Sequence, residues 1–462
     1  MNPPETGHPA SDAETEGCLT AIRALGHVGG RTTTTGGGRA RTEHSSGPVA
    51  AAPPYWLRIF DRYLAGESAS WMGTSVYSVA LPALAILYLH ATPGQVAALY
   101  FANQIPNFVL ALPAGAVVDR HPKKYVLIAT DITAACLVAV IPAASAAGVL
   151  SIPLLQAVAV LLGAVTVLHQ AAATAILPQL VPPPELHQAT SRLGAALGAA
   201  DTAGVYLGGA VVAAVGAARA IALDSLSYLF SAWCASRIPA EPIPAPRTRT
   251  RLTTEMWEGV RYVLRDPLLR PLARCLGGTG AGAGMITALS SWYLLAVLHI
   301  GSTGLAVIMG VSGAGGLVGA LLAPRVVRRL GPGRVLTSTV ALYWVLGVPL
   351  LVAGPGRLWL SVLALAGGLQ LAAAACASST VLAVRQQICP AHLRARAQQT
   401  ATWMVAGSRP LAALGAAALA TTAGVRVTLL AGTLVLAGTA AALWASPVRH
   451  LTDMPTASSR SP

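Results

Sequence analysis

Charged side chains are scarce in this 462-residue chain: Asp, Glu, Lys and Arg make up 10% of it, whereas apolar residues make up 54%. An ordinary soluble domain carries about 25% charged residues. A soluble protein of this length needs charge at its surface, and this composition does not supply it. The composition therefore excludes a soluble protein and predicts a membrane-embedded one.

Paired cysteines and common catalytic motifs are also missing. The six cysteines have no paired spacing, and most lie inside or beside apolar runs, so we interpret them as small apolar fillers. The sequence contains neither a G-x-x-x-x-G-K-[ST] phosphate-binding loop nor an H-E-x-x-H metal motif. We therefore expect a protein that is not an enzyme, has no metal site and binds no cofactor.

Long apolar runs rich in Gly and Ala dominate the chain. A membrane-spanning helix needs about 20 predominantly apolar residues, and close helix packing in membranes favours small side chains. The pattern predicts an all-α membrane protein with twelve transmembrane helices. The expected spans are 63–89, 96–118, 125–147, 152–177, 188–213, 218–236, 272–298, 303–323, 335–354, 358–384, 397–421 and 426–445.

The basic residues predict the orientation of these spans. The net charge of +14 is concentrated in alternate loops, whereas the other loops carry only Arg219, Arg357 and Arg426. Because Lys and Arg are enriched in cytoplasmic loops, both termini are expected on the cytoplasmic side of the plasma membrane. The charge thus indicates orientation in a lipid bilayer and does not indicate a nucleic-acid partner.

A proline- and arginine-rich break divides the spans six and six. We expect a disordered cytoplasmic tail at 1–56, a six-helix half at 57–236 and a cytoplasmic linker at 237–267. A second six-helix half at 268–446 and a C-terminal tail at 447–462 complete the chain. Since features of the two halves recur in the same order, the halves are expected to be pseudo-symmetric.

A short charged loop between the second and third spans carries the strongest motif. Its sequence is Gly115-Ala-Val-Val-Asp-Arg-His-Pro-Lys-Lys124. It resembles the G-x-x-x-D-R-x-G-R-K loop of the major facilitator superfamily, with matches at Gly115, Asp119, Arg120, Lys123 and Lys124. The resemblance implies a cytoplasmic gate that latches one half against the other, with Gly115 permitting close helix approach. A simple basic anchor at the membrane surface is the alternative.

The fifth span carries a second motif, Gly204-Val-Tyr-Leu-Gly208-Gly209. It resembles the G-P-x-x-G-G motif of superfamily exporters, with Val205 in place of the proline and hence without the kink that proline introduces. Whatever the direction of transport, Gly204, Gly208 and Gly209 are expected to form a helix-packing face.

Ionisable residues inside membrane spans are costly and therefore mark candidate sites. Glu67 in the first span and His169 in the fourth lie at similar depth, so together they are candidates for proton coupling, because histidine changes protonation near neutral pH. Alternatively, Glu67 lies at the membrane surface and His169 only satisfies a backbone carbonyl. Asp201 is a third proton-coupling candidate. Asp131 and Asp224 are interpreted as structural.

Arg409 lies near the middle of the eleventh span, where an unpaired cation is costly. It could bind an anionic group of a substrate or pair with a carboxylate such as Asp201. Four amide side chains could complete a polar substrate cavity, and they are Asn103, Gln104, Gln170 and Gln370.

Further stretches, among them Ile176-Leu-Pro-Gln-Leu-Val-Pro182, resemble the superfamily branch of macrolide-efflux and siderophore-export proteins. This resemblance implies a monomeric drug:proton antiporter that uses the proton gradient to export a drug-like, antibiotic or siderophore-like small molecule. Its expected partners are that molecule, protons and the bilayer. An importer of the same fold and a membrane sensor or scaffold without transport activity are the alternatives.

Overall fold

The computed structural model describes residues 55–239, 261–388 and 394–451 of the chain. Within these ranges all regular secondary structure is helical, which confirms the all-α fold class. Most of the predicted tails and of the linker lies outside the described residues, namely 1–54, 240–260 and 452–462. Residues 55 and 56 of the predicted N-terminal tail instead belong to the first helix, and Pro447–His450 of the predicted C-terminal tail form a short 3-10 helix, η4. The domain boundaries that involve these segments remain predictions.

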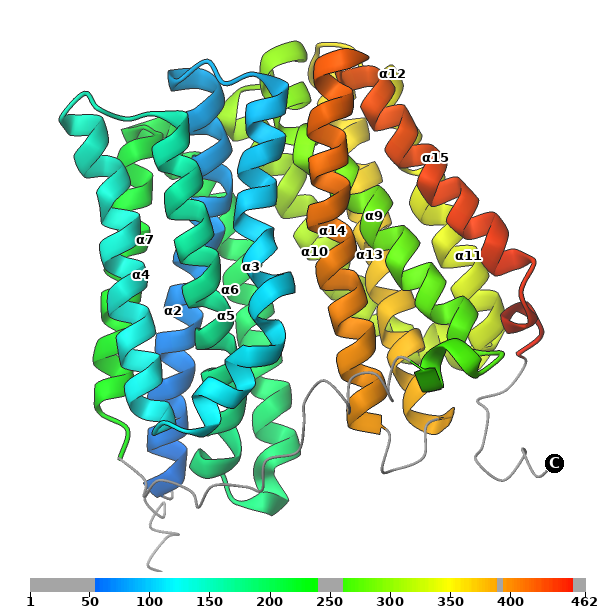
Figure 1. Cartoon of the computed structure of the whole chain (residues 1–462), viewed down its shortest axis with the longest axis horizontal. Coiled ribbons are helices and arrows are strands. Elements are labelled where there is room, and N and C mark those ends of the chain that lie inside the picture. Colours follow the sequence, from blue (N-terminus) through cyan, green and yellow to red (C-terminus); the bar gives the residue numbers. More distant parts are fainter. Residues whose placement is uncertain (1–54, 240–260, 389–393, 452–462) are drawn as a thin grey trace, which may run out of the picture. The chain divides into compact units, whose positions relative to one another are not determined.

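Each expected span corresponds to a helix or a pair of consecutive helical segments (Figure 1). The first half contains α2 (Tyr55–Ala83) with its π-helical extension η1 (Leu84–Tyr88), α3 (Pro93–Asp119), α4 (Lys123–Ala146), α5 (Ile152–Leu180), α6 (Leu186–Val215) and α7 (Ala217–Ser236). The second half contains α9 (Leu269–Trp292) with its π-helical extension η3 (Tyr293–Val297), α10 (Gly301–Leu330), α11 (Pro332–Val345), α12 (Val348–Val352), α13 (Arg357–Ile388), α14 (Arg394–Thr422) and α15 (Val425–Trp444).

Ten helices in the described ranges are long and apolar enough to cross a bilayer. In that count, α2 is joined to η1, α9 to η3, and α11 to α12. The two remaining expected spans coincide with α3 and α7. The chain is therefore a multi-pass membrane protein, and the positions of its helices agree with the spacing of the apolar runs.

Local sequence explains where helices begin. Thr92 precedes α3, and its side chain accepts a hydrogen bond from the backbone N–H of Gln95, whose side chain accepts one from the N–H of Thr92. This reciprocal capping box satisfies donors that the first helical turn leaves unpaired, and Pro93 has no N–H to satisfy.

The two halves repeat unusual backbone features at equivalent places. The first helix of each half ends in a π-helical turn, η1 or η3, and each turn is followed by a histidine with positive φ: His90 at 51° and His299 at 52°. Gly216 and Gly424, with φ of 86° and 89°, form the turns before the last helix of each half. These repeats agree with the expected pseudo-symmetry.

Packing within each half is extensive. In the first half, α2 packs on α6 and α7, while α5 packs on α3 and α4. In the second half, α9 packs on α14 and α15, while α10 packs on α13. The two main contacts between the halves are α3 with α14 and α6 with α10.

The α10–α13 contact depends on two glycines. A Cβ added at Gly315 or Gly319 would collide with the backbone of Gly368 or Ala372 on α13. Small residues let membrane helices approach closely enough for backbone contact. By contrast, a Cβ at Gly415 on α14 would meet nothing within 4 Å.

Gly319→Ala should destabilise the protein by about 1–3 kcal/mol, because its methyl group must displace the α13 backbone. Gly415→Ala is the matched control and should leave stability unchanged or raise it slightly, since Ala is the better helix former. Thermal unfolding of the purified variants in detergent measures both effects. Equal stability of the two variants would contradict the packing described for α10 and α13.

Candidate functional site

The two halves share one apolar core at the end of the molecule that carries Ala91 and Trp292, here called the sealed end. The largest buried cluster combines first-half residues such as Leu84 and Val212 with second-half residues such as Leu289. The Trp292 indole N–H donates a hydrogen bond to the Ala91 carbonyl, at 3.0 Å, across the two halves. The sealed end is thus held by both apolar packing and a hydrogen bond.

The end that carries the 115–124 loop, here called the basic end, is organised differently. The clusters formed there by the described residues draw on one half each: Phe60, Leu127 and Ile176 belong to a first-half cluster, and Leu269 and Leu336 to a second-half cluster. A third, smaller cluster of Ala323, Val335 and Cys376 also belongs to the second half alone. Among the described residues, the halves therefore have separate cores at the basic end and one common core at the sealed end.

The two halves meet along two helix pairs, α6 with α10 and α3 with α14, and each line of contact is here called a seam. Close approaches between α6 and α10 show where the first seam ends. Near the sealed end, Gly209 packs against Ala306 and Gly310 against Tyr206. Further toward the basic end, a Cβ at Gly198 would meet Leu317 at 3.9 Å, and one at Gly194 would meet nothing within 4 Å. Contact between these helices is thus lost progressively toward the basic end.

The α3–α14 seam follows the same course. The rings of Phe108 and Trp403 stack with centroids 5.0 Å apart and planes inclined by 26°. One turn beyond Trp403, Gly407 makes room for Phe108. Gly115, closer to the basic end on α3, has open space where a Cβ would stand. None of the described residues approaches that position within 4 Å, so the close-approach role expected for Gly115 stays a prediction.

Three ionisable side chains meet inside the first half. His169 on α5 lies with Nε2 3.2 Å from Oε1 of Glu67 on α2 and with Nδ1 3.3 Å from Oδ1 of Asp131 on α4. The side chain of His169 is 14% exposed and those of Glu67 and Asp131 are 6% and 1% exposed. The structure thus brings Glu67 and His169 together within the membrane-spanning region, away from the surface position considered for Glu67.

Asp131 belongs to this cluster although the sequence placed it among the structural residues. Both of its carboxylate oxygens are buried, and neither has a partner with hydrogen-bond geometry. The Thr130 hydroxyl lies 3.1 Å from His169 Nδ1 and competes with Asp131 for that nitrogen. Two acids around one histidine give the cluster a net charge that depends on how many protons it holds.

The two remaining charged candidates lie on different seams. Asp201 on α6 accepts a hydrogen bond from the Ser75 hydroxyl on α2. Arg409 lies on α14, and the described part of the chain contains no ion pair that includes it. The pairing of Arg409 with Asp201 considered above is not formed in this structure, where α6 packs mainly on α2 and α10 and α14 mainly on α3 and α9.

The four amide candidates differ in their surroundings. Asn103 and Gln104 are half-buried on α3, and Gln104 accepts a hydrogen bond from Asn107 at 3.5 Å. Gln170 is exposed on α5. Gln370 instead donates a hydrogen bond of 2.8 Å to the Tyr343 carbonyl near the break between α11 and α12. A cavity role for Gln370 is thus not supported, since its amide nitrogen satisfies that backbone acceptor.

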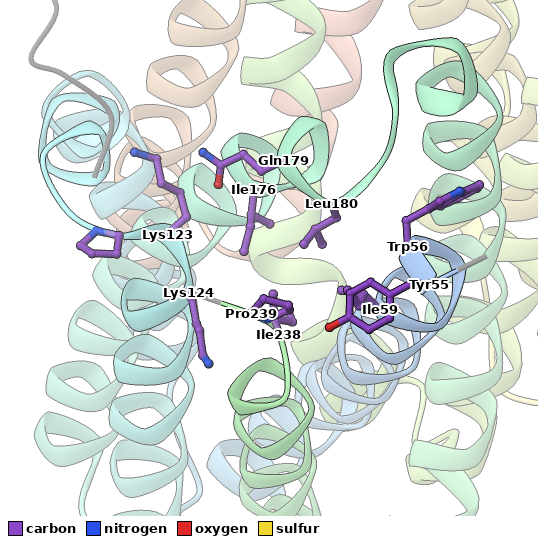
Figure 2. Close-up of a pocket in the computed structure, with 11 residues that line it drawn as sticks. Tyr55, Trp56, Ile59, Lys123, Lys124, Ile176, Gln179, Leu180, Ile238 and Pro239 are labelled. Carbon is purple, nitrogen blue, oxygen red and sulfur yellow. The ribbon is translucent and has the colours of Figure 1, made fainter. Parts of the chain in front are cut away.

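The loop at the basic end borders a small cavity. Arg120 is exposed, and the side chain of Asp119 lies outside the described part of the structure. Lys123 and Lys124 line a cavity of about 260 Å³ together with aromatic and apolar residues from the ends of α2, α5 and α7. Figure 2 shows the two lysine side chains pointing apart, with Tyr55 and Trp56 across the cavity from Lys123.

The glycines of the fifth span contact two different helices. A Cβ at Gly204 or Gly208 would collide with the α2 backbone at Met72 or Val76, whereas one at Gly209 would collide with Ala306 on α10. The motif therefore joins α6 to its own half through two glycines and to the other half through the third. Asp224 on α7 also faces this half's interior, where Gly73 leaves room for its carboxylate.

Two six-helix halves that share a core at one end and have separate cores at the other, with ionisable groups inside the spans, define a secondary-transporter fold. The Major Facilitator Superfamily model matches residues 64–413. The chain belongs to that superfamily.

A curated relative is the uncharacterised MFS-type transporter y4rN of Sinorhizobium fredii, 29% identical over 175 residues. That match covers 38% of this chain and 43% of the relative, so it spans less than half the length of either.

Solved structures share the fold at low identity. The nucleoside transporter NupG aligns with a TM-score of 0.70 at 12% identity, over 84% of this chain and 98% of that one. A bacterial homologue of the iron transporter ferroportin aligns at 0.65 in its inward-facing state, at 17% identity over 84% of this chain and 98% of the other. Its outward-facing state aligns at 0.55, at 16% identity over 84% and 99%.

Gln370→Leu should lower the free energy of unfolding by about 1–3 kcal/mol, because it leaves the Tyr343 carbonyl without its donor. Gln170→Leu removes an exposed amide of the same size and should change stability little. Chemical or thermal unfolding of the two variants distinguishes them. An unchanged stability for Gln370→Leu would contradict its assignment to helix packing.

Proposed function

We propose that the protein is a secondary active transporter that exports a drug-like, antibiotic or siderophore-like small molecule in exchange for protons. The cluster of Glu67, His169 and Asp131 is the observation that carries this proposal. Burying ionisable groups in a membrane protein costs several kcal/mol unless they are paired, and such groups commonly mark ion pathways.

The cluster can couple proton uptake to movement of the helices that carry it. Glu67, His169 and Asp131 come from α2, α5 and α4, so a change in their protonation alters the attraction between three helices at once. With both acids ionised and the histidine protonated, the cluster keeps one excess negative charge. Taking up one proton neutralises it and reduces the cost of enclosing it in a low-dielectric interior.

Alternating access supplies the mechanism. The seam that is open at the basic end supports a conformation that admits cargo from that side, and the shared core at the sealed end closes the other side. Transport then requires the sealed end, including the Trp292–Ala91 hydrogen bond, to separate while the basic end closes. In this scheme Gly115, Asp119, Arg120, Lys123 and Lys124 form the gate of the basic end.

The basic end is proposed to face the cytoplasm of a cell whose plasma membrane holds the protein. Arg and Lys are concentrated in the loops at that end, whereas Arg219, Arg357 and Arg426 lie at the other. An inward-facing resting state then suits an exporter, because cargo enters the cavity from the cytoplasm.

Replacing Glu67 with Gln should abolish proton-coupled efflux. Asp131 and protonated His169 then already form a neutral pair, so the cluster has no excess negative charge that would take up a proton. A panel of anionic, neutral and cationic fluorescent dyes is loaded into expressing cells, and efflux is followed with and without a protonophore. Asp61→Asn, which removes the half-exposed ion pair with Arg192, is the matched control and should retain transport. Protonophore-sensitive efflux that survives in Glu67→Gln would contradict the proposed coupling site, and uptake in place of efflux would indicate an importer.

The proposed orientation predicts opposite labelling at the two ends. In a variant without native cysteines, Arg120→Cys should react with a membrane-impermeant maleimide only after cells are permeabilised. Thr422→Cys, at the end of α14 on the sealed side, should react in intact cells. The reverse pattern would overturn the orientation.

A further inference from the structure

Arg409 lies on the interior-facing side of α14. Ala413, Ala416 and Ala420, which follow it at helical spacings of four, seven and eleven residues, are buried in the core shared by the two halves. Leu411 and Leu414, on the other side of the helix, are 56% and 48% exposed and suit contact with lipid. Arg409 is itself exposed although it belongs to the buried face. Its side chain therefore marks the point along this face of α14 where the core shared by the two halves ends.

The surroundings of Arg409 are polar without being acidic. It lies within electrostatic range of the Tyr100 phenol on α3 and the Tyr343 phenol on α11. The Tyr100 hydroxyl lies near the Gln104 side chain, which accepts a hydrogen bond from Asn107 at 3.5 Å. Tyr100, Gln104 and Asn107 follow a spacing of four and three residues, so they form one polar stripe along α3.

The guanidinium group lacks an acidic partner in the described ranges, where the ion pairs join His169 with Glu67 and Asp131, and Arg192 with Asp61. A guanidinium group near the centre of a membrane costs several kcal/mol when it is unpaired. Because the guanidinium group is planar, two of its N–H groups can donate parallel hydrogen bonds to the two oxygens of a carboxylate. A bound organic anion would supply the missing charge.

Two aromatic side chains lie near Arg409. They are Tyr100 on α3, from the other half, and Tyr343 on α11, and both are within electrostatic range of the guanidinium group. An anion attached to a flat body of two or three rings would place its charge at Arg409 and its rings beside these phenol rings.

We infer that Arg409, with Tyr100 and Gln104 from the other half, forms a substrate subsite for an aromatic carboxylate. This inference rests on the proposed transport function, because it concerns the cargo of that transporter. A cargo molecule bound there would contact both halves. Its carboxylate would bind Arg409 on α14, and its rings would lie near α3 of the other half.

Binding of 2-naphthoate tests the subsite, with 2-naphthamide as the neutral probe of the same shape. Equilibrium dialysis against the purified full chain should show the carboxylate binding at least about tenfold more tightly than the amide, as expected for a hydrogen-bonded charge pair. Arg409→Gln should remove that preference. Arg426→Gln, a change of the same kind at the exposed start of α15, should keep it.

Arg409→Lys keeps the positive charge but cannot donate two parallel hydrogen bonds to a carboxylate. It serves as a second variant if Arg409→Gln does not fold. It should retain a weaker preference for the carboxylate. Equal binding of the two probes by the wild-type protein, no binding of either, or full retention of the preference in Arg409→Gln would overturn the subsite.

Glu67→Gln separates this inference from the proposed function. It should lose proton-coupled efflux while it binds 2-naphthoate as the wild type does. If no gradient-driven efflux of any dye is found but Arg409-dependent binding of 2-naphthoate holds, the coupling proposal fails and the subsite stands.

Discussion

The structure depends on a seam that is closed at one end only. At the sealed end, side chains of both halves share one apolar core, and the Trp292 indole bonds the Ala91 carbonyl. At the basic end each half has a core of its own. Because each half is already packed at that end, the two can separate there without exposing a common core. Arg409, which is exposed, and the half-buried polar stripe of α3 lie on the two helices of the α3–α14 seam.

Ionisable side chains inside the membrane set the second constraint. Burying each one costs free energy, which contacts with neighbouring groups must offset. Glu67 and Asp131 each lie within ion-pair distance of His169, and Asp201 accepts a hydrogen bond from Ser75. Arg409 has an aromatic and amide environment in place of a carboxylate. The cluster and Arg409 therefore lend themselves to different tasks, proton exchange within one half and anion recognition between the halves.

The sequence predicted the helix positions well, because long apolar runs and the glycines between them determine where membrane helices fall. It also placed Glu67 and His169 at equal depth, since depth follows from helical rise along each span. It missed Asp131 because depth alone does not reveal which face of a helix a side chain occupies. The same limitation explains Gln370, whose partner is a backbone carbonyl at a helix break, and the Arg409–Asp201 pair, whose helices lie on different seams.

The central claim is that protonation of the Glu67 cluster biases the opening of the basic end. Spin labels at Gln188 on α6 and Arg328 on α10 report that opening, because both positions are exposed near the basic end of opposite halves. Electron–electron distance measurements in lipid nanodiscs should show a distribution that shifts with pH in the labelled wild-type protein and does not shift in Glu67→Gln. An equal pH-dependent shift in both proteins, or none in either, would contradict the account.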